Sequence, residues 1–192
     1  MLASRNVLSQ LILLRQTEMI QLELRLVGLI MERNIYNVRP LQEGDARDIL
    51  SWRYSFPYQF YDPPQSNSQD LLIAQFLDPA LNFHAVVQEN LGFIGFCSFG
   101  IDGRVPGGNY SEPALDIGLG MKPELTGQGR GTAFFRSIML HCESFVPAKR
   151  RLTVATFNER AIRLYRRFDF FEVERFQDSL SDVEYVIMVR EN

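Results

Sequence analysis

Three glycines occupy alternating positions in the segment PELTGQGRGTAFF, residues 123–135, immediately before an apolar run. They are Gly127, Gly129 and Gly131, and they lie between a predicted strand and the start of a predicted helix. The first N–H groups of a helix have no partner inside the helix, and the helix dipole favours an anion beside them. Glycines allow a ligand to approach the backbone closely. The segment therefore predicts a loop that binds phosphate.

The spacing excludes two common phosphate-binding loops. A nucleotide-binding P-loop requires Lys and then Ser or Thr after its last glycine, but Gly131 is followed directly by Thr132. A dinucleotide-binding loop requires the pattern G-x-G-x-x-G, and here the sixth position is also Thr132. The pattern that remains, G-x-G-x-G-T, is also compatible with a glycine-rich turn that only begins a helix.

A helix predicted at 158–168 carries two polar side chains that could bind or protonate a ligand. Asn158, Ala161 and Tyr165 are spaced i, i+3 and i+7, so they share one face of the helix. About 10 Å of helical rise separates the amide from the phenol. Asn158 is also well suited to cap the helix N-terminus, which is its alternative interpretation.

Composition limits the classes of function. The chain has 192 residues, which fits one domain or one domain with an appendage. The net charge is −3, so no basic field favours a nucleic acid or an anionic membrane as a partner. No cluster of Cys and His indicates a metal. Cys97 and Cys142 lie in apolar stretches, and we expect buried thiols in a reducing compartment, which predicts a cytoplasmic protein.

Residues 1–34 differ from the rest of the chain. They are rich in Leu and Ile, but charges interrupt the apolar run too often for a membrane span. Three interpretations stay open: an organelle presequence, an amphipathic helix that binds a partner, and extra translated sequence before a start at Met31. We expect a non-catalytic extension, followed by the catalytic domain at 35–192.

Apolar periodicity and turn residues predict the element order β-αα-βββ-α-β-α-ββ. The predicted strands are 35–42, 83–88, 93–101, 114–121, 151–157, 170–176 and 183–190, and the predicted helices are 43–55, 68–78, 132–146 and 158–168. This order contains both hairpins and crossovers. We therefore expect an α/β (α+β) fold with a mixed sheet and helices on its faces.

The glycine loop and the Asn–Tyr helix together resemble the GNAT superfamily of acyl-CoA-dependent N-acyltransferases. Residues 123–132 are similar to the pyrophosphate loop of that family, Q/R-x-x-G-x-G/A, with Thr126 at the Q/R position. The stretch NERAIRLYRRFDFFE resembles the later Asn–x–x–Ala–x–x–x–Tyr helix, with Asp169 at its usual glycine corner. The resemblance spans Ile35 to Arg190. It implies a mostly antiparallel, twisted sheet that is split at its fourth strand.

The resemblance implies acetyl-CoA as co-substrate and no metal. Backbone groups of Leu119 and Met121 would pair with the pantetheine arm, beside a bulge that Gly118 and Gly120 would accommodate. Backbone N–H groups of the loop would hold the pyrophosphate, and Arg130 would either contact the 3′-phosphate or remain solvated. The implied cofactor-binding residues are Leu119, Met121, Thr126, Gly127, Gln128, Gly129, Arg130, Gly131, Thr132 and Asn158.

The resemblance also implies roles in catalysis. An alkyl amine has a pKa of about 10 and must lose a proton before it attacks a thioester, so a general base is required. Asp116 matches a position where some family members carry an acidic base, and Glu112 is the nearby alternative. The backbone N–H of Leu119 would stabilise the developing oxyanion. Tyr165 would donate a proton to the departing thiolate.

The segment SWRYSFPYQFYDPP corresponds to the acceptor side of the family. Trp52, Tyr54, Tyr58 and Tyr61 are expected to form an aromatic wall, and Asp62 would help to bind a cationic amine. The loop at 101–113 is expected to form the opposite lip or a lid.

The sequence thus predicts an N-acetyltransferase that transfers an acetyl group from acetyl-CoA to a primary amine by direct attack in a ternary complex. The acceptor would be a small amine or a protein amine. The alternative is a non-catalytic CoA-binding sensor or partner-binding module on the same fold. We expect a monomer or homodimer that binds neither nucleic acid nor membrane.

Overall fold

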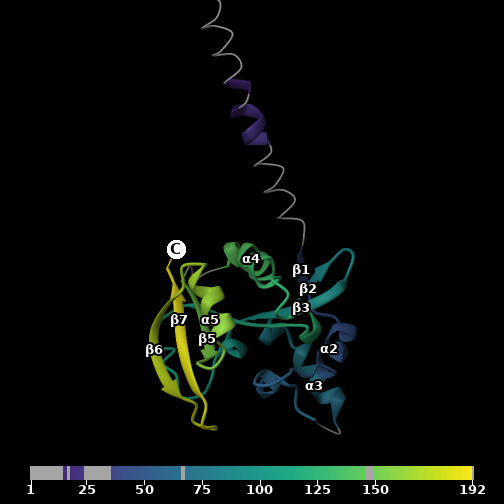
Figure 1. The fold of residues 1–192 in the computed structure, drawn as a ribbon. Coiled ribbons are helices and arrows are strands. Elements are labelled where there is room, and N and C mark those ends of the chain that lie inside the picture. The colour runs from purple at the N-terminus through teal and green to yellow at the C-terminus, as the bar shows by residue number, and fades with distance from the viewer. Residues whose placement is uncertain (1–14, 17, 24–35, 66–67, 146–148, 192) are drawn as a thin grey trace, which may run out of the picture. The chain divides into compact units, whose positions relative to one another are not determined.

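The computed structural model describes residues 15–16, 18–23, 36–65, 68–145 and 149–191 (Figure 1). The chain divides into two compact units, Met1–Ile35 and Tyr36–Asn192. In the first unit, the described residues are helical and exposed. The rest of that unit lies outside the described residues, so the division into an extension and a catalytic domain stays a prediction. No helix in the described part of the chain is long and apolar enough to cross a membrane.

The second unit is built on one seven-stranded sheet with the order β1-β2-β3-β4-β5-β7-β6. Its strands are β1 (Asn37–Pro40), β2 (Phe83–Gln88), β3 (Gly92–Phe99), β4 (Leu115–Met121), β5 (Arg150–Ala155), β6 (Phe171–Gln177) and β7 (Glu184–Arg190). All neighbouring strands are antiparallel except β4 and β5, which are parallel. Figure 1 shows β1, β2 and β3 in one half of the sheet and β5, β7 and β6 in the other. The predicted element order and mixed sheet are confirmed.

In the described part of the chain, four α-helices connect the strands. They are α2 (Glu43–Leu50), α3 (Gln69–Phe76), α4 (Gly131–His141) and α5 (Glu159–Arg166). The prediction extended α2 to residue 55 and α4 to 146, and both ends are wrong. After α2, the indole N–H of Trp52 donates to Asp48 and turns the chain inward. After α4, the chain continues as the 3-10 turn Cys142–Ser144, and the buried guanidinium of Arg150 donates to the Cys142 carbonyl at 2.6 Å. Residues 146–148 lie outside the described residues.

Two apolar clusters cover opposite faces of the sheet. Successive strand side chains point to opposite faces, and Phe96 and Cys97 of β3 accordingly belong to different clusters. Cys97 packs with residues of α4 and α5, such as Phe135 and Tyr165. Phe96 packs with residues of α2 and α3, such as Ile49. Helices α4 and α5 therefore cover one face, and α2 and α3 cover the other. Both cysteines are buried free thiols, as predicted.

Strands β4 and β5 pair over only two residues and then separate. Leu115 pairs with Arg150 and Asp116 pairs with Arg151, whereas β3 pairs with β4 as far as Met121. The predicted split at the fourth strand is confirmed. The predicted bulge in β4 is wrong, because the β3–β4 register from Ile117 to Met121 is unbroken.

The edge of β4 beyond Asp116 directs backbone groups into this gap. Hydrogen bonds from the Gly100 N–H to the Asp116 carbonyl and from the Lys122 N–H to the Ile94 carbonyl fix the alternation of the β3–β4 ladder. Even-numbered residues of β4 therefore bond β3, and odd-numbered residues direct their N–H and C=O groups toward β5. Leu119 and Met121 are two of these odd-numbered residues.

A buried ion cluster lies where the two strands meet. The Asp116 carboxylate, which is 1% exposed, accepts from Arg104 Nε at 2.7 Å and from two nitrogens of Arg151, a residue that is 3% exposed. Both guanidinium groups lie over the Tyr110 ring, and the Tyr110 hydroxyl is 3.1 Å from Thr153 Oγ1 on β5. The cluster fixes the point at which β4 and β5 part.

Asp116→Asn is expected to lower the free energy of unfolding by about 3–5 kcal/mol, because Arg151 would keep its charge in a buried position without a counter-ion. Glu112→Gln is the control, since the Glu112 side chain is 75% exposed and solvent screens its ion pair with Lys149, so we expect little change. Urea unfolding followed by circular dichroism measures both changes. Equal effects of the two substitutions would contradict the assignment of the cluster.

Candidate active site

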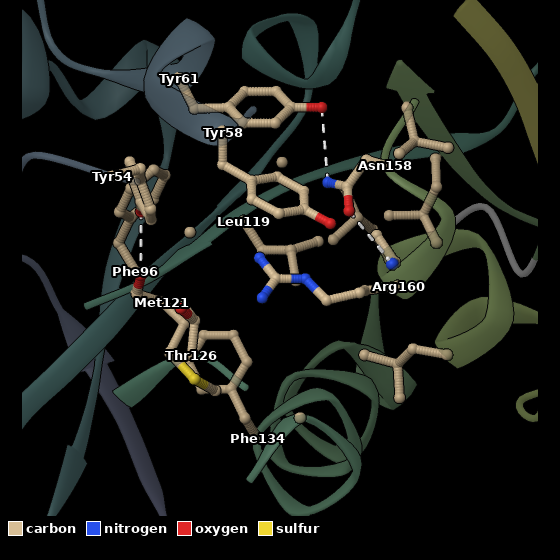
Figure 2. A pocket seen from close by; sticks show the side chains of 18 of the residues that line it. Tyr54, Tyr58, Tyr61, Phe96, Leu119, Met121, Thr126, Phe134, Asn158 and Arg160 are labelled. Carbon is tan, nitrogen blue, oxygen red and sulfur yellow. Dashed lines mark hydrogen bonds between the residues drawn. The ribbon is translucent and has the colours of Figure 1, made fainter. Parts of the chain in front are cut away.

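A cleft of about 700 Å³ opens where β4 separates from β5. Its walls come from β4 and β5, from the loop before α4, from α5, and from the segments that follow α2 and β3 (Figure 2). Figure 2 shows Tyr58 and Tyr61 across the cleft from the side that carries Thr126 and Phe134. The cleft therefore brings together the glycine loop, the Asn–Tyr helix and the aromatic segment, which are far apart in the sequence.

The glycine loop lines one end of the cleft with bare backbone. Gly127 and Gly129 have φ values of +75° and +76°, which only glycine adopts without strain. A Cβ added to Gly129 would meet no atom within 4 Å, so open space lies above this residue. Gly131 begins α4, and its φ is ordinary. The loop thus presents a helix N-terminus and accessible N–H groups to the cleft, as an anion requires.

Among the loop side chains, only some face the cleft. Thr126 and Thr132 line the cleft, whereas Gln128 and Arg130 do not. The Gln128 amide donates to the Glu124 carbonyl at 2.7 Å, and Arg130 Nε lies 3.5 Å from the Gln128 side chain. The contact expected of Gln128 is through its backbone N–H, which its side-chain position does not affect. For Arg130, the geometry gives no support for a contact of its side chain with a ligand in the cleft, and the solvated alternative stays open.

Two arginines of α5 and its end supply the positive charge that sequence reasoning missed. Arg160 and Arg167 both line the cleft, and Arg167 also donates to Thr132 Oγ1 at 3.3 Å. The Arg160 guanidinium lies 3.8 Å from the centre of the Tyr58 ring, and Figure 2 shows it reaching into the middle of the cleft. The available signal was their i, i+7 spacing, which places both on one face of a helix beginning at Asn158.

Asn158 uses its side chain in two structural contacts. Its Oδ1 accepts from the Ala161 N–H at 3.2 Å, so it caps α5, and its Nδ2 lies 3.4 Å from the Tyr61 hydroxyl. The helix cap predicted as one interpretation is confirmed. One N–H of the amide remains for a ligand, because the side chain carries two donors and Tyr61 engages one.

The Tyr165 side chain extends from α5 into the floor of the cleft. Tyr165 is 6% exposed and packs on Phe135, with ring centres 5.1 Å apart. The residue lines the cleft, and no hydrogen bond joins its hydroxyl to another residue that the structure describes. Burial, and secondarily the neighbouring Tyr61, raise the pKa of the phenol. The hydroxyl therefore stays protonated at neutral pH and can donate a proton.

The aromatic segment after α2 lines the opposite half of the cleft. Trp52, Tyr54, Tyr58 and Tyr61 all contribute, as predicted for the wall. The Tyr54 hydroxyl donates to the Met121 carbonyl at 2.8 Å, which ties the segment to the open edge of β4. Both the N–H and the C=O of Met121 face the gap. Tyr54 contacts only the C=O. Trp52 is buried and stacks on Phe96, so it supports the wall from behind.

The acidic residues of the cleft differ from those predicted. Asp116 does not line the cleft, and its carboxylate is enclosed by two guanidinium groups. Glu112 is exposed, paired with Lys149 and also outside the cleft lining. The prediction of either as the general base is therefore not supported by the geometry. The carboxylates that line the cleft are Asp62 and Asp102.

The loop after β3 forms a fixed lip of the cleft. Gly103 lies against β4, where an added Cβ would be 3.0 Å from Ile117 and 3.1 Å from the Gly118 nitrogen. Arg104 and Tyr110 hold the loop to the ion cluster. Of the two roles expected for this loop, the contacts support the lip.

Comparison with known proteins identifies the family. The model described as "Acetyltransferase (GNAT) family" matches residues 45–170, more than half of the chain. The chain belongs to this family and is an acyl-CoA-dependent N-acetyltransferase. The comparison with curated proteins found no match.

Two similar solved structures come from one group of enzymes. One is spermidine N-acetyltransferase from Vibrio cholerae in complex with CoA and spermine, with 20% identity over 81% of this chain and 94% of that chain and a TM-score of 0.62. The other is a chimera of the Vibrio cholerae enzyme SpeG and hSSAT, with 21% identity over 80% and 93% and a TM-score of 0.61. At these identities, the likeness shows the fold.

Gly129→Ala is expected to lower the free energy of unfolding by about 1–2 kcal/mol, because alanine is strained at its positive φ. Gly131→Ala is the matched control. Its φ is ordinary, and the added Cβ would be 3.4 Å from Leu164 Cδ2, an ordinary contact. Thermal unfolding of the two variants and the parent measures the difference. A loss of stability in Gly131→Ala of equal size would contradict this assignment.

Proposed function

We propose that this enzyme acetylates a cationic primary amine with acetyl-CoA, by direct attack of the amine in a ternary complex. The observation that carries the proposal is the open edge of β4. Buried backbone groups require partners, and the odd-numbered residues of β4 beyond Asp116 face a cleft instead of β5. An amide-containing arm such as pantetheine can pair with such an edge.

The cofactor half of the cleft fits the chemistry of acetyl-CoA. The glycine loop at the N-terminus of α4 offers N–H groups for the pyrophosphate, and Arg160 and Arg167 supply positive charge beside it. Leu119, Met121 and Asn158 would bind the pantetheine amides. Acetyl-CoA supplies the activated acetyl thioester when it is bound.

The acceptor half fits a cationic amine. Aromatic rings attract ammonium groups, and Asp62 and Asp102 add negative charge to the lining of the cleft. One of the two similar structures contains spermine, which is a polycation, although the shared identity is only 20%. We therefore propose a small polycationic amine rather than a protein amine as the acceptor.

The chemistry needs one donor and one oxyanion contact from this chain. The Leu119 N–H, on the open edge of β4, would donate to the carbonyl oxygen as negative charge develops there. Tyr165, whose hydroxyl is protonated and lines the cleft, would protonate the departing thiolate. A CoA-binding sensor would require neither group, so turnover decides between the enzyme and the sensor.

Calorimetric titration with acetyl-CoA is expected to give a micromolar dissociation constant. Arg160→Ala should weaken binding about tenfold or more, because charge-assisted hydrogen bonds contribute about 1.5–3 kcal/mol. Arg163→Ala is the matched control on α5, since the Arg163 side chain is 60% exposed and pairs with Glu159. A folded parent that does not bind acetyl-CoA would disprove the proposed cofactor.

Tyr165→Phe is expected to lower kcat about 100-fold with spermidine as acceptor, because proton transfer typically contributes 10²–10⁴-fold. Acetyl-CoA affinity and unfolding temperature should stay near those of the parent, since the phenyl ring preserves the packing on Phe135. Release of free thiol measures the rate. Unchanged kcat would remove Tyr165 from the mechanism.

A further inference from the structure

Asp102 is a cleft carboxylate that neither the sequence pattern nor the resemblance selected. It lies in the short 3-10 turn Ile101–Gly103, directly after β3. Its Oδ2 accepts from the buried Ser98 hydroxyl at 2.6 Å. Ser98 has the same parity as Phe96 on β3, so this contact lies on the face of the sheet that packs against α2 and α3. That face also carries the aromatic wall.

Strand β4 has a glycine, Gly118, at the position that lies next to the Asp102 carboxylate. Ser98 pairs with Gly118 across the β3–β4 ladder. A Cβ at Gly118 would approach Ser98 Oγ and lie 3.1 Å from Asp102 Oδ2. Gly118 therefore leaves room for the Ser98–Asp102 pair, next to Leu119 on the open edge of β4. The need for this space explains the glycine at position 118. The predicted bulge, which the structure does not have, does not explain it.

The other acids near the cleft are committed to different partners. Asp116 is enclosed by Arg104 and Arg151, and Glu112 pairs with Lys149 outside the cleft. Asp62 accepts from the Tyr54 N–H at 2.7 Å and so holds the aromatic segment in place. Only the Asp102 carboxylate, among the acids that line the cleft in the described chain, is held by a neutral hydroxyl and no backbone donor.

The surroundings of Asp102 favour its basic function. Burial raises the pKa of the carboxyl, and the hydrogen bond from Ser98 lowers it by a smaller amount. The charged groups that line the same cleft are Asp62, Arg104, Arg160 and Arg167, and its phenols include Tyr165. Arg104 is paired with Asp116. A carboxylate with a raised pKa is a better proton acceptor at neutral pH than an ordinary one.

We propose that Asp102 is the general base of the reaction, with Ser98 as the residue that positions it. This inference rests on the proposed function. The carboxylate accepts a proton from the acceptor ammonium, and the freed lone pair forms the new C–N bond. The C–S bond breaks, its electron pair goes to sulfur, and Tyr165 supplies the proton that sulfur takes. The nitrogen of the new C–N bond loses its second proton, which restores the Tyr165 hydroxyl. The products are the N-acetylated amine and CoA thiol, and the proton on Asp102 passes to solvent.

Asp102→Asn separates the chemistry from the fold. Asparagine keeps the size of the side chain and can still accept from Ser98. With spermidine as acceptor, kcat/KM near neutral pH should fall about 100-fold, while acetyl-CoA affinity stays at the parent value. The pH profile should change as well. The parent should have a plateau through neutral pH, whereas the variant should rise about tenfold per pH unit as the free amine deprotonates itself.

Asp70→Asn is the matched control, because the Asp70 side chain is 93% exposed and does not line the cleft. Its rate and pH profile should equal those of the parent. Ser98→Ala tests the positioning role, since it removes the hydrogen bond that lowers the pKa of Asp102. It should shift the acidic limb of the kcat/KM profile to higher pH.

A titration of the unliganded protein gives a readout apart from activity. The side-chain carboxyl resonance of Asp102, identified in carbon-13 NMR by its absence from Asp102→Asn, should titrate above the ordinary range of an aspartate. In Ser98→Ala, it should titrate higher still. An ordinary or lowered pKa in the parent would overturn the assignment.

The outcomes distinguish the two proposals. If the parent acetylates spermidine and Asp102→Asn retains the rate and the plateau, Asp102 is not the base, and the proposed function stands. If Asp102→Asn loses acetyl-CoA affinity or unfolds together with its activity, its role is structural, and the assignment fails. If the folded parent neither binds acetyl-CoA nor acetylates an amine, both proposals fail.

Discussion

The separation of β4 from β5 after Asp116 is the constraint on which the rest of the structure depends. A sheet interior normally pairs every backbone group, and here one strand turns its odd-numbered residues toward a cleft. The ion cluster of Asp116 with Arg104 and Arg151 holds the strands together up to the last pair, and Tyr110 links the cluster to β5. The opening therefore begins at a fixed residue, and the cleft has a defined position relative to the loop before α4.

Along β4, the edge of the strand and the face of the sheet have different roles in the proposed site. Backbone groups of Leu119 and Met121 lie in the plane of the sheet and face the gap, where a cofactor arm would pair. The missing side chains of Gly118 and Gly120 leave space on the face that carries Ser98 and the aromatic residues. In the proposed function, the edge of this strand would bind the donor of the acetyl group, and its face would lie beside the acceptor. Tyr54 connects the two halves through its hydrogen bond to the Met121 carbonyl.

Much of the fold could be predicted from the sequence, because the apolar periodicity of each element is local. The element order, the family and the glycine loop all followed from short patterns, and Asp169 indeed adopts a positive φ of 63° at the corner after α5. Tyr165, the proposed acid, also followed from a short pattern, whereas Asp102, the proposed base, did not. Asp116 pairs with Arg104 and Arg151, which are distant from it in the sequence. From the sequence alone, an aspartate in a buried ion pair therefore cannot be distinguished from one that is available as a base. Asp102 lies in an irregular loop, and only the folded loop brings it over Gly118.

Asp116 and Asp102 illustrate what makes a carboxylate a structural anion or a base. Asp116 receives three charge-assisted hydrogen bonds from guanidinium groups, and protonation would break the cluster that joins β4 to β5. Asp102 receives one hydrogen bond from a neutral hydroxyl, which orients it, and the residue lines the cleft. A base must exchange its proton at every turnover, and the fold can tolerate that exchange only where no strand junction depends on the charge. Position in the hydrogen-bond network, rather than position along β4, therefore decides which acid is suited to catalysis.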